Sequence, residues 1–131
     1  MINEELLLKD LTARLPYNVK FPIIDWDDDT QEEVQVNATL YSINKDGYVR
    51  TLESDYEFDI TSIKPYLFPL SSMTEEQREE LRAFDSFDTE EIMTLGEWAI
   101  RLVDFYNKYH FDYRGLIEKG LAIDATNLNV Y

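Results

Sequence analysis

The sequence predicts an α+β fold in which a small antiparallel sheet of three or four strands packs against a long helix in the C-terminal half and an N-terminal helix. Apolar side chains alternate with polar ones in several stretches between residues 19 and 60, whereas they recur at helical spacing before residue 16 and after residue 73. With 131 residues, 44% of them apolar, the chain is long enough for the core of one domain. We therefore expect residues 1–131 to form a single domain.

The N-terminal helix is predicted from a cap and from leucine spacing. Asn3 precedes Glu4 and Glu5, a pattern typical of a helix N-cap followed by a first turn with acidic side chains. The leucines that follow at helical spacing are Leu7, Leu8, Leu11 and Leu15. We expect the helix to end near Leu15, because Pro16 cannot continue it.

Four stretches predict the strands of the sheet. The clearest is VQVNATLYSI, residues 34–43, in which every second side chain from Val34 to Leu40 is apolar. Asn44 to Gly47 predicts a turn to a partner strand, since glycine accepts a positive φ. In VKFPII, Pro22 favours an edge strand or a bulge. The expected strands are residues 19–24, 34–43, 48–52 and 56–60.

The second half of the chain predicts helices. MTEEQ, residues 73–77, has the spacing of a capping box and begins a largely polar helix that ends near Phe84. MTLGEW, residues 93–98, combines a capping box with a hydrophobic staple. It begins a helix to Tyr109 whose broad apolar stripe we expect to cover the sheet. RGLIEKG, residues 114–120, predicts a short helix closed by its last glycine.

The stretch IDWDDDTQEEV, residues 24–34, holds six carboxylates within nine positions. It is a cation site, a surface for a basic partner or a solvated loop between strands. Aspartates at the first, third and fifth positions from Asp25 match a calcium loop. However, Thr30 stands where the sharp turn needs glycine, and Val36 where a bidentate glutamate belongs. We therefore expect no metal here, and a loop and a partner surface remain.

The chain is acidic, and its charge is unevenly distributed. It has 27 acidic and 12 basic residues, and residues 25–91 hold 19 of the acids and five of the bases. Such a surface repels phosphate groups, so we expect no direct binding to nucleic acid or to an anionic membrane. There is no cysteine, no apolar run long enough to span a bilayer and no basic segment at the N-terminus. We expect a cytoplasmic protein without disulfides.

Catalytic signatures are sparse. The single histidine, His110, is expected to pack on aromatic side chains near a helix end. Glu76 and Glu80 lie one helical turn apart, but Arg78 and Arg82 are interleaved at salt-bridge spacing, which indicates a solvated helix face. No phosphate-binding loop, GxSxG or HExxH motif occurs. We expect neither an enzyme nor a cofactor.

Aromatic and apolar side chains gather between two prolines in IKPYLFPL, residues 63–70. Such a stretch is either a connection packed on the core or an anchor for a protein partner. The second interpretation makes Tyr66, Leu67 and Phe68 candidate contacts.

Three segments carry a resemblance to a family. LLLKDLTARLPYNVK, IKPYLFPLSSMTEEQREEL and NKYHFDYRGLIEKGLAIDA resemble short proteins, without an assigned function, of anaerobic gut bacteria and of their phages and mobile elements. The resemblance implies an intracellular accessory protein of prophage or mobile-element origin, and it implies no activity or site residues.

Two classes of function compete, with an enzyme that lacks a recognisable motif as a third. The first is a non-enzymatic protein that binds another protein through the region from Tyr66 to Leu70 or through the C-terminal helical segment. The second is an acidic decoy that imitates DNA in the basic cleft of a nuclease, repressor or restriction enzyme. The candidate partner-binding residues are Tyr66, Leu67, Phe68, Asp27, Asp28 and Glu32. A decoy would hold on one face Asp27, Asp28, Glu32, Glu57, Asp59, Glu76 and Glu80.

Overall fold

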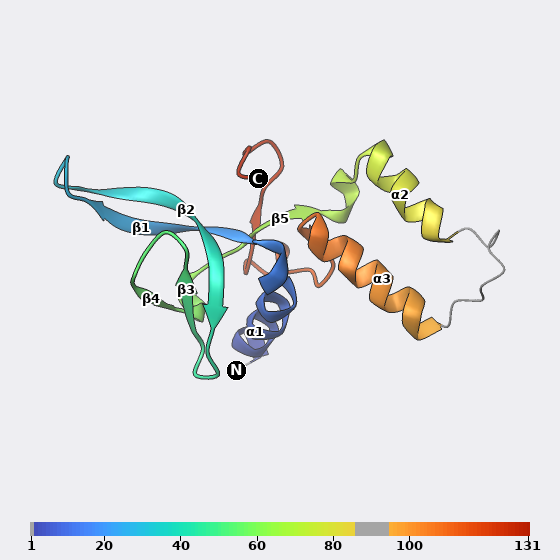
Figure 1. Ribbon diagram of the computed structural model, residues 1–131, viewed down its shortest axis with the longest axis horizontal. Coiled ribbons are helices and arrows are strands. Elements are labelled where there is room, and N and C mark those ends of the chain that lie inside the picture. Colours follow the sequence, from blue (N-terminus) through green and yellow to red (C-terminus); the bar gives the residue numbers. More distant parts are fainter. Residues whose placement is uncertain (1, 86–94) are drawn as a thin grey trace.

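Three helices and two sheets make up the part of the chain that the computed structural model describes, residues 2–85 and 95–131 (Figure 1). The predicted α+β fold class is confirmed. The helices are α1 (Ile2–Arg14), α2 (Glu75–Asp85) and α3 (Leu95–Lys108). The strands are β1 (Lys20–Asp27), β2 (Glu32–Ile43), β3 (Tyr48–Thr51), β4 (Glu57–Asp59), β5 (Tyr66–Pro69), β6 (Phe111–Asp112) and β7 (Ile123–Asp124). Short 3-10 turns are η1 (Leu15–Tyr17), η2 (Ile60–Ser62) and η3 (Leu70–Ser72).

The larger sheet is antiparallel, with strand order β1-β2-β3-β4. The predicted turn between β2 and β3 is present: Gly47 has a φ of 86°, and its amide donates to the carbonyl of Asn44 over 3.1 Å. β1 lies at the sheet edge, as Pro22 indicated.

The acidic stretch is largely strand, which differs from the expected loop. β1 continues to Asp27 and β2 begins at Glu32, because their pairing extends from Lys20↔Thr39 to Asp27↔Glu32. A tight turn closes this hairpin, where Gln31 has a φ of 59° and its amide donates to the carbonyl of Asp27.

Helix α1 closes the core of the antiparallel sheet. Its Leu7 and Leu11 are buried, and it gives way to η1 where Pro16 follows, as expected. The buried core residues include Leu7, Leu11, Val19, Phe21, Ile23, Ala38, Leu40, Val49, Ile60 and Leu67.

A second, parallel sheet has the order β6-β5-β7. It pairs Phe68 with Phe111 and Tyr66 with Ile123, so it joins segments that lie far apart in the sequence. The helix predicted at residues 114–120 is replaced by turns, since Gly115 takes a φ of 72° at its start.

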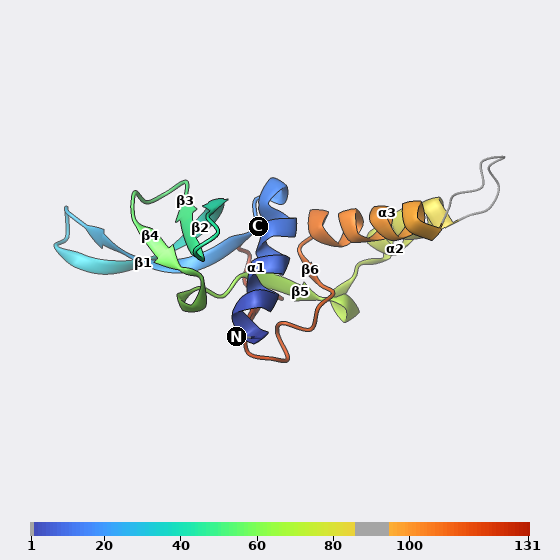
Figure 2. The same cartoon turned by 90° about the horizontal axis from the view of Figure 1, so that it is seen from below.

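Helices α2 and α3 lie on the other side of α1 from the antiparallel sheet (Figures 1 and 2). The predicted capping box of α2 is formed: the Thr74 amide donates to Gln77 Oε1 over 2.9 Å, and the Gln77 amide donates to Thr74 Oγ1 over 3.2 Å. The capping box and staple expected at residues 93–98 begin outside the described residues. α3 packs on β6 and α1, so the antiparallel sheet is covered by α1 where we had expected α3.

Candidate protein-binding site

A hairpin projects from one end of the molecule (Figure 1). β3 pairs with β2 only over Leu40–Ile43, whereas β1 and β2 continue as a two-stranded ribbon to the turn at residues 28–31. We call residues 22–37 the arm. One face of the arm packs on the core near its base, where Ile23 is 4% exposed, and the other face is exposed.

One face of the arm carries exposed apolar side chains. Ile24 is 59% exposed and Trp26 is 51% exposed, while the intervening Asp25 and the preceding Ile23 point to the other face. Their cross-strand neighbours are Gln35 and Glu33, which are also exposed. We call Ile24 and Trp26 the apolar pair. Tryptophan is the side chain most enriched where binding energy is concentrated in protein interfaces, so this pair is a candidate contact surface.

The predicted acidic residues lie at the tip of the same arm. Asp27 and Glu32 are cross-strand partners, and Asp28 follows Asp27 in the turn. The turn is fixed by the Asp29 amide, which donates to Asp27 Oδ1 over 2.9 Å. Within the described residues, no lysine or arginine pairs with an arm carboxylate, and no cluster of three potential metal ligands occurs. The tip is therefore an exposed negative charge beside the apolar pair.

Tyr66, Leu67 and Phe68 lie in the middle strand of the parallel sheet, and the burial of Tyr66 and Leu67 corrects the prediction of these two residues as partner contacts. Tyr66 and Leu67 are 5% and 0% exposed, and the Tyr66 hydroxyl donates to Asn37 Oδ1 over 2.9 Å. The stretch is thus the core-packing connection that the sequence left as its alternative. Phe68 is half-buried against the ring of Tyr131.

A buried ionic cluster fastens the parallel sheet to α1. Arg14 and Asp10 are fully buried, and Arg14 Nε donates to Asp10 Oδ2 over 2.7 Å. Arg14 Nη2 also donates to the carbonyl of Phe111 over 2.6 Å, and Arg114 Nε lies 3.5 Å from Asp10 Oδ1. Both guanidinium groups lie over the ring of Tyr113. The cluster joins α1 to residues 111–114, which lie far from it in the sequence.

His110 packs on an aromatic ring, as expected. Its ring stacks on Tyr131 at 3.7 Å between centroids. Burial, together with the positive charges of Arg14 and Lys20, lowers the pKa of His110 to about 4. The ring is therefore neutral at pH 7.

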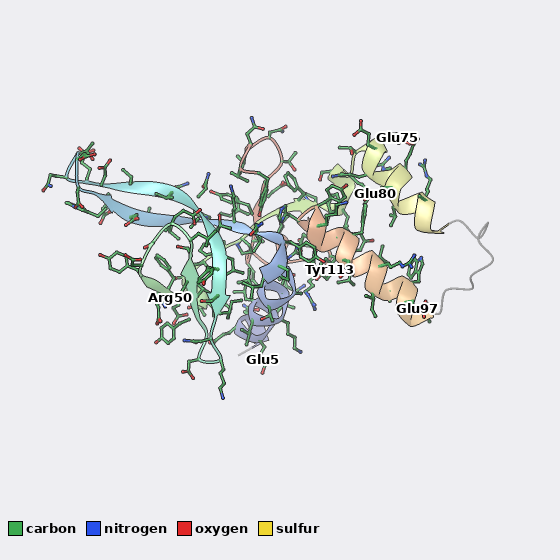
Figure 3. All side chains as sticks on the ribbon, in the orientation of Figure 1. Glu5, Arg50, Glu75, Glu80, Glu97 and Tyr113 are labelled. Carbon is green, nitrogen blue, oxygen red and sulfur yellow. The ribbon has the colours of Figure 1, made fainter. Side chains whose placement is uncertain are left out.

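A shallow groove of about 310 Å³ lies between η1, α2 and α3. Its walls carry charges of both signs, from Glu80 and Asp104 and from Arg101 and Lys108. Glu80 accepts hydrogen bonds from Lys108 Nζ over 2.9 Å and from the hydroxyl of Tyr109. Both hydrogen bonds lower the pKa of Glu80, and the one from Tyr109 has the larger effect. Figure 3 shows Glu80 on α2, on the side of α2 that faces α3. Its carboxylate is engaged in joining the two helices.

The comparisons with known proteins give no relative. The chain matches no protein-family model, and neither curated proteins nor solved structures match it. Among the described helices, none combines the length and apolar character needed to cross a membrane.

The sequence prediction identified the acids of the arm but missed the apolar pair. The signal was present: alternation of Ile24 and Trp26 with Ile23 and Asp25 continues the strand past Ile24. The acidic run masked it, since aspartate clusters indicate loops.

Proposed function

We propose that this protein is a non-enzymatic protein–protein interaction module that binds its partner through the arm. The observation that carries the proposal is the exposure of Ile24 and Trp26 side by side on a projecting hairpin. Burying one large apolar side chain at an interface contributes about 1.5–3 kcal/mol. The resemblance to proteins of gut bacteria and their phages implies an intracellular accessory role, which we include in this proposal.

The charge of the arm favours a basic partner. Six carboxylates lie between Asp25 and Glu33 with no basic residue among them. Complementary charge speeds association and rejects acidic competitors, whereas the apolar contact supplies most of the lasting affinity. We therefore propose a partner with an apolar recess bordered by lysine or arginine.

An acidic decoy that imitates DNA is the first alternative. It draws on the net charge of −15. A decoy needs its carboxylates in one row, but the arm and α2, which carries Glu75 and Glu80, lie at opposite ends of the molecule (Figure 3). This separation favours the interaction module. A second alternative, an enzyme without a recognisable motif, would use the groove between α2 and α3.

The test is affinity capture from a lysate of the native host with three versions of the tagged protein: wild type, Trp26→Gln and Ile24→Gln. Ile100→Gln is the matched control, because Ile100 is 64% exposed and lies on α3 at the other end of the molecule. We expect the wild type to capture one protein that stays bound at about 0.5 M salt, where exposed charges are screened. It should be lost with both arm variants and kept with Ile100→Gln. Capture of a basic nucleic-acid enzyme that salt abolishes and both arm variants retain would instead favour the decoy.

A further inference from the structure

The backbone of the arm has two edges, and the hydrogen-bond register shows which groups point outward from each. The Leu40 amide donates to the carbonyl of Val19 over 3.0 Å, so Val19 and Leu40 bond to each other. In an antiparallel pair such bonded positions alternate with positions whose amide and carbonyl point away. With the register of β1 and β2, the outward groups belong to Lys20, Pro22, Ile24 and Trp26 on β1 and to Glu33, Gln35, Asn37 and Thr39 on β2.

Two contacts outside the pair agree with this assignment. The Lys20 amide donates to the Tyr131 hydroxyl over 2.9 Å. On the other edge, the Thr39 amide donates to Glu53 Oε1 over 2.6 Å, and the Thr39 carbonyl accepts from the Leu52 amide over 3.1 Å.

The β1 edge is protected against a further strand. Tyr131 occupies the Lys20 amide, and Pro22 has no amide hydrogen. The Trp26 amide donates to Asp25 Oδ1 over 2.8 Å. Ile24 is left as one outward donor between blocked neighbours, which is how proteins prevent pairing at an exposed edge.

The β2 edge is open beyond Thr39. β3 begins its pairing at Leu40, and within residues 2–85 and 95–131 no strand pairs with β2 on that side at Glu33, Gln35 and Asn37. All three residues are exposed. Their amides and carbonyls form a regular row of donors and acceptors, the feature that strand addition uses.

We propose that the outer edge of β2, from Glu33 to Asn37, binds an extended segment of a basic partner by strand addition. The proposal rests on the proposed function and names its mode of binding. Side chains of the added strand alternate between two environments. In the partner's strand, the side chains next to the half-buried Val34 and Val36 are apolar, and the side chains next to Glu33 and Gln35 are lysine or arginine. A second copy of this chain fits poorly, because two arms would bring their carboxylates together.

The first test uses a capped peptide of about seven residues in which lysine and valine alternate, a length typical of a strand. It is added to the full-length ¹⁵N-labelled protein, and amide hydrogen exchange is followed by NMR. We expect exchange at Glu33, Gln35 and Asn37 to slow by at least about tenfold, with Ile24 unchanged. A peptide whose alternate backbone nitrogens are methylated on the pairing edge keeps the charge but loses the donors, and should not bind.

A pair of variants tests the same edge from the protein. Gln35→Pro removes an outward amide from β2. The control is Glu75→Pro, because Glu75 is the first residue of α2, where proline is tolerated, and lies at the other end of the molecule. With folding checked by circular dichroism, we expect Gln35→Pro to weaken peptide binding by at least about tenfold and Glu75→Pro to leave it unchanged.

The outcomes separate this inference from the proposed function. Equal affinity for the methylated and the unmethylated peptide, with chemical-shift changes only at the acidic tip, would overturn strand addition. So would a complete failure of the peptide to bind. After either result, the proposed function still holds if capture of the host protein depends on Trp26. Conversely, the proposed function alone fails if strand addition is observed but capture of the host protein does not depend on Trp26.

Discussion

Arg14 is the largest fully buried side chain among the described residues, and its charge is met by the Asp10 carboxylate and the Phe111 carbonyl, while Arg114 shares the same carboxylate. A buried ion pair stabilises a fold little compared with apolar side chains of the same volume, but removal of one partner leaves an uncompensated charge. The stability losses from replacing each member of the pair alone should therefore add up to more than the loss from replacing both.

We predict that Asp10→Ala destabilises the protein by about 3–5 kcal/mol, because Arg14 is left buried without its carboxylate. The double variant Asp10→Leu with Arg14→Met should lose much less than the two single variants together. Urea unfolding of wild type, Asp10→Ala, Asp10→Leu, Arg14→Met and the double variant measures these free energies. A loss below about 1 kcal/mol for Asp10→Ala would show that the cluster is not a buried clamp.

We predict that His110 makes stability depend on pH. Its pKa of about 4 in the folded protein lies below the usual 6.5. Between these two pH values, the unfolded chain therefore binds a proton at His110 that the folded chain does not bind. The contribution of the neutral ring is complete above about pH 6.5 and is lost as the pH falls towards about 4. Because the ring keeps some access to water, we expect a loss of about 1–2 kcal/mol, less than the full shift implies.

The comparison with His110→Asn isolates this effect. Asparagine accepts the φ of 60° at this position and does not titrate. Carboxylates titrate in both proteins, so the difference in unfolding free energy reports on the histidine. The variant should gain relative to wild type between about pH 7 and pH 4.5. A difference that is constant over this range would contradict the prediction.

Local sequence signals predicted several elements well. The first-turn acids and leucines of α1, the turn at Gly47 and the capping box of α2 depend on residues a few positions apart. The predicted cap at Asn3 was wrong, because α1 begins at Ile2 and Asn3 lies within the helix. The parallel sheet could not be predicted, since β6 and β7 are two residues each and their partner lies more than 40 positions away in the sequence. At the candidate site, the acids of the arm were foreseen and Trp26 was missed. Cross-strand pairing there overrides the loop preference of aspartate.

We predict that Gly47→Ala destabilises the β2–β3 hairpin. Alanine at a φ of 86° costs about 1–2 kcal/mol, and its Cβ would lie 3.5 Å from Ile60 Cγ2 and 3.2 Å from Glu4 Oε1. Gly120→Ala is the control, because Gly120 has a φ of 73° with open space around it. Thermal unfolding should show the larger loss for Gly47→Ala. A neutral Gly47→Ala would mean that the turn relaxes into another conformation.

The acidic arm lies at one end of the molecule, and α2 and α3 lie at the other end (Figures 1 and 2). The carboxylates of the tip gain nothing from ion pairs within the described residues. They repel each other, so their clustering favours a role in meeting a partner over a role in folding.

We predict that the triple variant Asp27→Asn, Asp28→Asn and Glu32→Gln is slightly more stable than wild type. Relief of repulsion between exposed charges is worth a few tenths of a kcal/mol, and about 0.5 M salt should remove the difference. The same variant should capture its partner more slowly at low salt. Calorimetry and association kinetics measure the two effects, and an unstable variant would give the tip a structural role instead.

Photo-cross-linking at Ile24 tests most directly whether the apolar pair of the arm contacts a partner. A photoreactive phenylalanine replaces Ile24 in one protein and Ile100 in the control, and both are irradiated in host lysate. We predict one discrete cross-linked protein from position 24 that is absent from position 100, and its yield should fall when Trp26→Gln is added. Equal cross-linking from both positions, or none from position 24, would contradict binding through the arm.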